Sequence, residues 1–174
     1  MPVFADGFAA AEAELMLHVA PGWDGAVPSD DAATMALVDA VHIGMEIASS
    51  PYPGINADGP AVTVSDFGNN IGIIIGAAVT GWRDMDLCAI PVRTEIDGAC
   101  VGADSAANLL DGPWGAVRFL LANLAARGFD QSGRLWVSSG AITGVHVVRP
   151  GQRVRAEFGD IGALECTIEA AASS

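Results

Sequence analysis

"AAAEAELMLHV", residues 9–19, places two glutamates two positions apart in an otherwise apolar run. On a helix, Glu12 and Glu14 would point about 200° apart, whereas on a strand both would leave the same face. Burying a carboxylate without a partner is costly, and two adjacent like charges repel each other. A hard divalent cation, Mg²⁺ or Mn²⁺, would stabilise both because it prefers oxygen ligands. The stretch therefore predicts a strand with a candidate metal site, and the alternative for the pair is a solvated strand face.

The composition of the chain limits the partners it can have. Its 174 residues are enough for one domain, residues 1–174, with a substantial core. A net charge of −13, with eight arginines and no lysine, argues against nucleic acid and anionic membranes. The longest nearly apolar run, residues 71–82, is too short to span a bilayer, and the start shows no signal peptide. We therefore expect a cytoplasmic protein.

Two further features of the composition concern assembly and the cysteines. Hydrophobic residues make up 51% of the chain, which is high for a soluble monomer, so we predict a homodimer or larger homo-oligomer. Cys88, Cys100 and Cys166 are odd in number and far apart, which suits a reducing compartment and excludes a cysteine-based zinc site. We expect all three to be small buried hydrophobic residues.

The first half of the chain predicts two strands separated by a short helix. The expected elements are a strand over residues 8–19, a short helix reaching about Val41, a buried strand over residues 42–49, and a loop from Pro51 to Pro60. Ser29 or Asp30 can cap the helix, because both side chains accept hydrogen bonds from backbone N–H groups.

The second half predicts short strands interrupted by one clear helix. Asp97-Gly98 is a strong hairpin signal. The helix would begin after Asp111, with Pro113 in its first turn, and end at Gly128. Apolar residues recur along it at helical spacing and form one face, made of Trp114, Val117, Leu121 and Leu124. Strands dominate and two helices are convincing, so we predict a β-rich α+β roll or sandwich.

A third carboxylate, Glu46, stands alone in the apolar stretch "HIGMEIASS", residues 42–50. A Glu-x-Glu strand, a helix and a buried strand with an acid together resemble the fumarylacetoacetate hydrolase superfamily, in its 2-keto-4-pentenoate hydratase and 4-oxalocrotonate decarboxylase branch. Five segments carry this resemblance in order: "EAEL" (12–15), "MEIASS" (45–50), "VSDFGNNIGIIIG" (64–76), "NLLDGPWGAVRFLLANLAARG" (108–128) and "SSGAITGVHVVRPGQRVRAEFGDIGALECTI" (138–168).

The resemblance implies a mixed β-roll fold in which Glu12, Glu14 and Glu46 hold Mg²⁺ or Mn²⁺. A small anionic 2-oxo acid would chelate the ion, which would act as a Lewis acid and stabilise an enolate. The implied reaction is hydration or decarboxylation of 2-hydroxydienoic or 2-oxo acids, such as 2-hydroxypenta-2,4-dienoate in aromatic-compound catabolism. A carbon–carbon bond hydrolase of the same superfamily is a neighbouring alternative.

Further site candidates follow from the matched segments. In the loop after the third ligand, Asp66 is a candidate catalytic residue, and Ser65 and Asn70 are candidate substrate contacts, although such clusters also form ordinary turns. Ser139 and Gly140 match an element that lies near the substrate carboxylate in the family. We therefore assign Ser139 a catalytic or substrate-binding role, and Gly140 a substrate contact. A nucleophilic serine is not indicated, because no Gly-x-Ser-x-Gly elbow occurs.

One feature of the family has no counterpart in this sequence. Family hydratases carry an N-terminal segment that contributes a lysine to the active site, whereas this chain begins at the Glu-x-Glu strand and contains no lysine. Two hypotheses therefore stand: a metal-dependent lyase with another proton carrier, or a non-catalytic core that binds metal and a 2-oxo acid.

Overall fold

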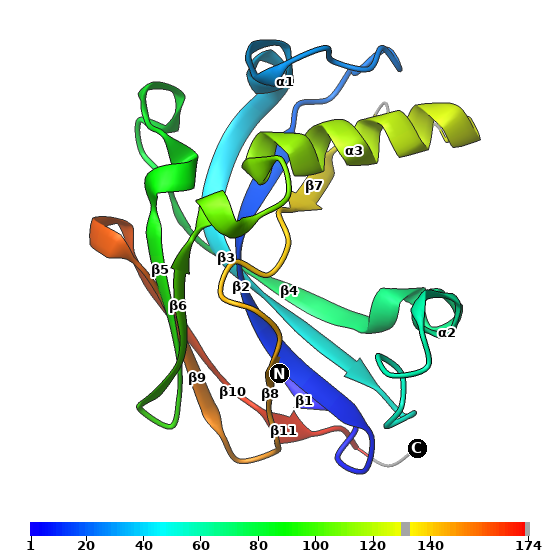
Figure 1. Ribbon diagram of the computed structural model, residues 1–174, viewed down its shortest axis with the longest axis vertical. Coiled ribbons are helices and arrows are strands. Elements are labelled where there is room, and N and C mark those ends of the chain that lie inside the picture. The colour runs from blue at the N-terminus through cyan, green and yellow to red at the C-terminus, as the bar shows by residue number, and fades with distance from the viewer. Residues whose placement is uncertain (130–132, 173–174) are drawn as a thin grey trace.

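The fold is built around two long antiparallel strands, β2 (Phe8–Val19) and β3 (Val38–Ser50) (Figure 1). The structure, a computed structural model, describes residues 1–129 and 133–172. Strand β4 (Asn70–Ala78) pairs with β3, while β7 (Leu135–Ser138) and β8 (His146–Val147) pair with β2. Together they make a five-stranded sheet in which all pairs are antiparallel.

A second sheet lies beside the first and contains four antiparallel strands in the order β10-β9-β5-β6 (Figure 1). Its strands are β5 (Pro91–Ile96), β6 (Ala99–Ser105), β9 (Arg153–Phe158) and β10 (Gly162–Thr167). The β5–β6 hairpin turns through Asp97 and Gly98, whose φ angles are both positive (51° and 81°), as the predicted two-residue turn requires. Near the termini, β1 (Pro2–Val3) and β11 (Glu169–Ala170) pair in parallel.

Three α-helices flank the first sheet in the described part of the chain: α1 (Asp31–Leu37), α2 (Pro60–Ser65) and α3 (Gly112–Arg127). Short 3₁₀ turns cover Phe67–Asn69, Trp82–Asp84, Leu87–Ala89, Ala106–Asn108 and Gly159–Ile161. Asp30 caps α1 by accepting the Ala33 N–H at 2.8 Å, as predicted. None of the helices in residues 1–129 and 133–172 has the length and apolar character needed to cross a membrane.

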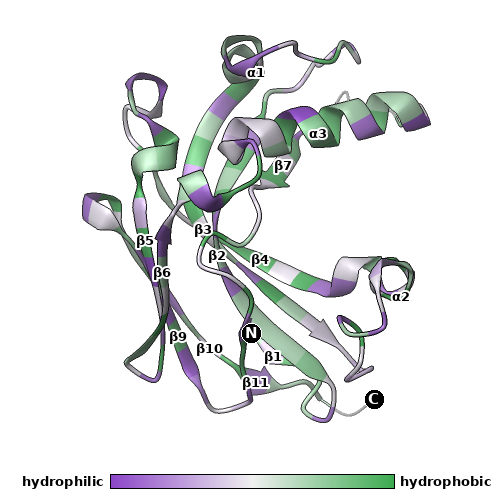
Figure 2. Ribbon diagram, viewed as in Figure 1, coloured by the Kyte–Doolittle hydropathy of each residue, from purple (hydrophilic) through white to green (hydrophobic). Residues whose placement is uncertain are grey.

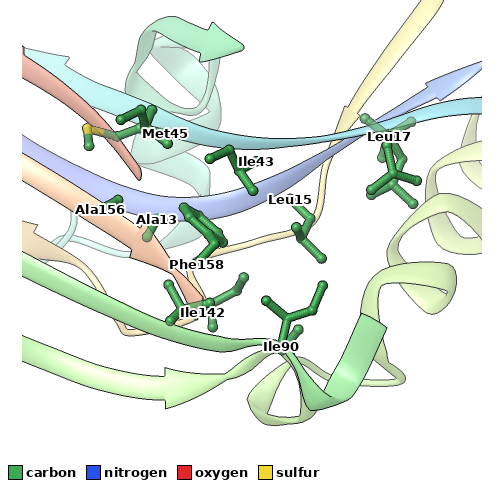
Figure 3. Close-up of a cluster of buried hydrophobic side chains, with 14 of the residues drawn as sticks. Ala13, Leu15, Leu17, Ile43, Met45, Ile90, Ile142, Ala156 and Phe158 are labelled. Atoms are coloured by element: carbon green, nitrogen blue, oxygen red, sulfur yellow. The ribbon is translucent and has the colours of Figure 1, made fainter. Parts of the chain in front are cut away.

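The main core lies between the two sheets. Figure 3 shows Leu15, Ile43 and Met45 from the first sheet near Ala156 and Phe158 of the second. Their burial is the main source of stability, at roughly 1.5–3 kcal/mol for each large apolar side chain. Figure 2 shows mainly hydrophobic residues along β2, and both hydrophobic and hydrophilic residues along α3. The apolar face predicted for α3 packs as expected, with Trp114, Val117 and Leu121 buried.

The predicted fold class, β-rich α+β, is confirmed, and four details need correction. The first helix ends at Leu37 rather than near Val41, because Val38 and Val41 extend β3 and pair with β2. The loop expected up to Pro60 is followed by an additional short helix, α2, with this proline in its first turn.

The other two corrections concern a helix cap and the cysteines. Asp111 occupies the cap position of α3, but its backbone is left-handed (φ 57°) and its side chain makes no capping hydrogen bond. The cysteines are not fully buried. Cys100 is exposed on β6, an edge strand of the second sheet, and Cys88 and Cys166 are half-buried.

Candidate metal centre

Glu12, Glu14 and Glu46 lie on one face of the β2–β3 pair. Glu12 is directly opposite Glu46 in the antiparallel register, and Glu14, two residues further along β2, is opposite Gly44. Directly opposed residues have Cβ atoms about 4.5–5.5 Å apart. The neighbouring odd-numbered residues of β2 belong to the core between the sheets, so the glutamates project from the other face. The predicted strand geometry for the pair is therefore present, and β3 adds the third carboxylate beside it.

Burial and mutual repulsion act strongly on these carboxylates. Burial raises the pKa of Glu12 to about 7, with repulsion from Glu46 and Glu14 adding to it. Burial also raises the pKa of Glu14 to about 7, where hydrogen bonds from Ser138 and Gly140 partly oppose the rise and Glu46 adds repulsion. Glu14 is only 1% exposed. Since carboxylates normally lose their protons near pH 4, this face holds negative charge only at a cost that a cation would offset.

Two donors from the end of β7 orient the Glu14 carboxylate. The Ser138 hydroxyl and the Gly140 backbone N–H, at 2.8 Å for the latter, both donate to Glu14 Oε2. These bonds direct Oε2 toward the loop and orient the whole carboxylate, as outer partners of metal-binding side chains commonly do. Gly140 thus lies at the site, as the sequence predicts, although its contact is to a carboxylate of the chain.

The serine whose hydroxyl reaches Glu14 is Ser138, the residue before the candidate Ser139. Ser139 is buried, and its hydroxyl accepts the Leu15 N–H at 3.0 Å and donates to the Gly140 carbonyl at 3.3 Å. Successive residues at a strand end point to opposite faces, so Ser138 faces the glutamates and Ser139 joins the loop to β2. Sequence reasoning missed Ser138, because the pairing of Met16 with Ser138, which puts this serine on the even-numbered face of β2, is not visible in the sequence.

Asp66, the candidate catalytic residue, has a buried carboxylate oxygen without a hydrogen-bond partner. Its Oδ2 is the one buried side-chain oxygen or nitrogen without a hydrogen-bond partner in residues 1–129 and 133–172. The next residues are strained, because Phe67 and Asn69 have positive φ angles of 53° and 52°. Buried unpaired groups and strained backbone both concentrate at functional positions. These observations keep Asp66 as a candidate that can accept or donate a proton.

The two substrate-contact candidates beside Asp66 differ in their surroundings. Asn70 begins β4 opposite Ala48, two residues from Glu46 and on the same side of the sheet. It is exposed and available for a ligand. Ser65 is also exposed, but its hydroxyl donates to the Val62 carbonyl within α2 at 2.7 Å. The structure therefore brings Asn70 toward the glutamates and leaves Ser65 engaged in its own helix.

The same face carries a group of rings that sequence reasoning did not single out. Trp136 packs against His18 and His42, with ring centroids 4.7 and 5.4 Å apart. His18 Nδ1 makes a hydrogen bond with Asp39 Oδ1, and His42 Nδ1 lies 2.8 Å from the Gly76 carbonyl. Both imidazoles thus already have partners. The in-phase position of His18 was visible in the sequence, but its pairing with Asp39 depends on the β2–β3 register.

The donors fit a hard divalent cation by chemistry, since all three side chains offer carboxylate oxygens. Among the described residues, however, no group of three carboxylate, imidazole or thiol side chains is arranged to hold a metal ion as it stands. The backbone register brings the three glutamates together, while their like charges favour divergent side chains. The structure therefore shows three neighbouring carboxylates on one face, not an assembled coordination shell.

The sequence of the chain is similar to that of a known enzyme. 4-oxalocrotonate decarboxylase of Pseudomonas putida is 28% identical over 130 residues, which is 75% of this chain and 49% of that protein. The chain thus spans about half the length of this relative. No protein-family model matches the chain.

Solved structures share the fold. That of 4-oxalocrotonate decarboxylase from Pseudomonas putida G7, complexed with calcium and acetate, matches with a TM-score of 0.80 at 23% identity, over 92% of this chain and 60% of that one. 5-carboxymethyl-2-hydroxymuconate delta-isomerase from Mycobacterium smegmatis matches with a TM-score of 0.71 at 16% identity, over 99% of this chain and 64% of that one.

Proposed function

Because these matches place the chain in the fumarylacetoacetate hydrolase superfamily, close to 4-oxalocrotonate decarboxylase, we propose that it is a divalent-metal-dependent lyase acting on 2-oxo acids. The resemblance predicted from five sequence segments is thereby confirmed. The observation that carries the proposal is the alignment of Glu12, Glu14 and Glu46 on one sheet face, with two of their pKa values raised to about 7.

Each residue of the site has a distinct part in this proposal. Glu12, Glu14 and Glu46 would hold Mg²⁺ or Mn²⁺, and Ser138 would keep the Glu14 carboxylate oriented. When bound, the cation supplies positive charge that stabilises an enolate formed from the 2-oxo group. Related structures were solved with calcium and with magnesium, which supports a divalent cation as the type of ion.

Decarboxylation is the reaction that we favour over hydration, because both the sequence relative and the structural match of TM-score 0.80 bear the decarboxylase name. The carbon–carbon bond to the departing carboxylate breaks, its electrons move into the 2-oxo system, and a proton then adds to carbon. Asp66 is our candidate for that proton transfer, since its Oδ2 atom is buried and free of other partners in the described structure. The chain has no lysine to do this.

The test separates binding from turnover. Calorimetry should show oxalate binding only when Mg²⁺ or Mn²⁺ is present, because the ion completes the chelation site. Assays of carbon dioxide release from 4-oxalocrotonate and of 2-hydroxypenta-2,4-dienoate loss then identify the reaction. We expect slow turnover, lower by roughly 10²–10⁴-fold than in an enzyme with a dedicated acid/base lysine.

The outcomes distinguish the hypotheses. Metal-independent oxalate binding contradicts the proposed site. Metal-dependent binding with no turnover of either compound favours the non-catalytic core. Turnover that survives in Asp66→Asn assigns the proton transfer to another group.

A further inference from the structure

The long helix α3 has an exposed apolar outer face, on the side away from the core. Val117 and Leu121 are buried in the core. Phe119 lies two residues from each of them, so its side chain leaves the helix on roughly the opposite side. It is 72% exposed, and α3 extends past β7 at the edge of the molecule (Figure 1). Since surface helices normally carry polar residues on their outer face, this helix is unusual.

The apolar surface continues to both ends of the helix. Ala126, about two turns after Phe119, is also exposed. Just before α3, Leu110 is 90% exposed, and just after it, Phe129 is 57% exposed. Exposed apolar side chains that follow one another along a surface element mark a site of interaction with another molecule.

The charge of α3 is compatible with a second copy of the chain as that partner. The chain has 21 acidic residues and a net charge of −13, so two copies repel each other over most of their surface. Helix α3 contains no acidic residue, and its two charged side chains are Arg118 and Arg127. Two copies that meet through this helix therefore bring no helical carboxylates together.

The positions of the end residues match a two-fold arrangement. The exposed residues Asp111 and Arg127 lie eight residues before and eight residues after Phe119. A two-fold axis at Phe119 sets the two helices antiparallel and brings Asp111 of each copy to the level of Arg127 of the other. Leu110 and Phe129, nine residues before and ten after Phe119, reach a common level in the same way. Antiparallel helix dipoles add a further attraction.

We propose that two copies of this chain pair antiparallel through the outer faces of α3, about a two-fold axis at Phe119. The homo-oligomer expected from the composition then has a defined interface. The inference is independent of the proposed function, because none of these residues belongs to the glutamate site. A helix of 16 residues is roughly 24 Å long. The interface is therefore small, and we expect a dissociation constant on the order of micromolar.

The first test measures self-association by sedimentation equilibrium at increasing micromolar concentrations. The wild type should show a monomer–dimer equilibrium. Phe119→Glu should weaken dimerisation by about tenfold or more, since it removes the central apolar contact and places two carboxylates at the axis. Because Phe119 is exposed, the variant should unfold in urea as the wild type does. Val64→Glu is the matched control, since Val64 of α2 is 73% exposed, and it should dimerise normally.

The second test asks whether Asp111 and Arg127 interact between copies. Within one chain they lie at opposite ends of α3, roughly 24 Å apart and well beyond the Debye length of about 8 Å. Arg127→Glu should weaken dimerisation several-fold, because it sets two carboxylates at one level. Adding Asp111→Asn should restore part of the affinity, whereas Asp111→Asn alone should weaken it. Asparagine also tolerates the left-handed backbone of this position, φ 57°.

Each contrary result overturns a stated part of the proposal. A wild type that stays monomeric at every concentration overturns the dimer. A dimer that survives in Phe119→Glu, or that is weakened equally in Val64→Glu, overturns α3 as its interface. Purely additive effects of Asp111→Asn and Arg127→Glu overturn the antiparallel arrangement.

Discussion

The two faces of the β2–β3 pair differ although both come from the same strands. One face contributes Leu15, Ile43 and Met45 to the core between the sheets. The other carries Glu12, Glu14 and Glu46, and its buried apolar residues Ala10, Met16 and Ala48 lie outside that core. Side chains that pack in the core thus alternate along each strand with positions on the face that carries the carboxylates. A substitution on the core face should therefore mainly change stability, and one of the glutamates should mainly change metal binding.

The largest effect is expected on the core face. Leu15→Ala should lower the free energy of unfolding by about 2–5 kcal/mol, because the fully buried side chain leaves a cavity between the sheets. Metal affinity of the folded variant should stay close to that of the wild type. Urea unfolding and Mn²⁺ titration measure the two quantities. A variant that keeps its stability but loses metal binding would contradict the division between the faces.

An effect of opposite sign is expected one position earlier. The pKa of Glu14 is raised from 4.5 to about 7 in the folded protein, so the folded state binds this proton more tightly than the unfolded state does. The stability gained from that proton is complete below pH 4.5 and is lost as the pH rises through 7. In metal-free protein, Glu14→Gln should therefore raise stability at pH 8, by on the order of 2 kcal/mol.

The check is urea unfolding of wild type and Glu14→Gln at pH 5 and pH 8 in the presence of a chelator. The difference between the two proteins should grow toward pH 8. If it is the same at both pH values, Glu14 is not destabilised by burial of its charge. Glu157→Gln, on the second sheet, is the control and should show no such growth.

The smallest effects should distinguish two adjacent serines. Ser138→Ala removes a donor to Glu14 and should weaken metal binding by about tenfold with little change in stability. Ser139→Ala removes the acceptor of the Leu15 N–H and should lower stability by about 1 kcal/mol with little change in metal affinity. Calorimetry and urea unfolding of both variants provide the comparison. Interchanged effects would show that the assignment of the two hydroxyls to opposite faces is wrong.

Local pattern was enough to predict the elements that carry the site. The acidic pair predicted β2 over residues 8–19, and these are its bounds in the structure. Capping by Asp30 and the Asp97-Gly98 turn were also predictable, because each depends on a few neighbouring residues. The end of α1 was not, since Val38 joins β3 only through its pairing with a strand that is distant in the chain.

For the same reason, residue roles that depend on the register between strands could not be predicted from the sequence. Ser138 rather than Ser139 meets Glu14 because β7 pairs with β2 in one particular register. Similarly, the contact between the turn Phe4–Gly7 and the segment Val147–Pro150, which line one cavity, joins parts of the chain about 140 residues apart. The roles of Asp66, Ser65, Asn70, Ser139 and Gly140 in substrate binding or catalysis, and the expected homo-oligomer, stay predictions.

The central claim is that the three aligned glutamates form one divalent-cation site. Titration of the metal-free protein with Mn²⁺, followed by calorimetry, tests it most directly. We predict about one saturable site per chain in the wild type and in the control Glu157→Gln, and none in Glu12→Gln or Glu46→Gln. A wild type without a saturable site, or glutamine variants that bind as the wild type does, would contradict the account.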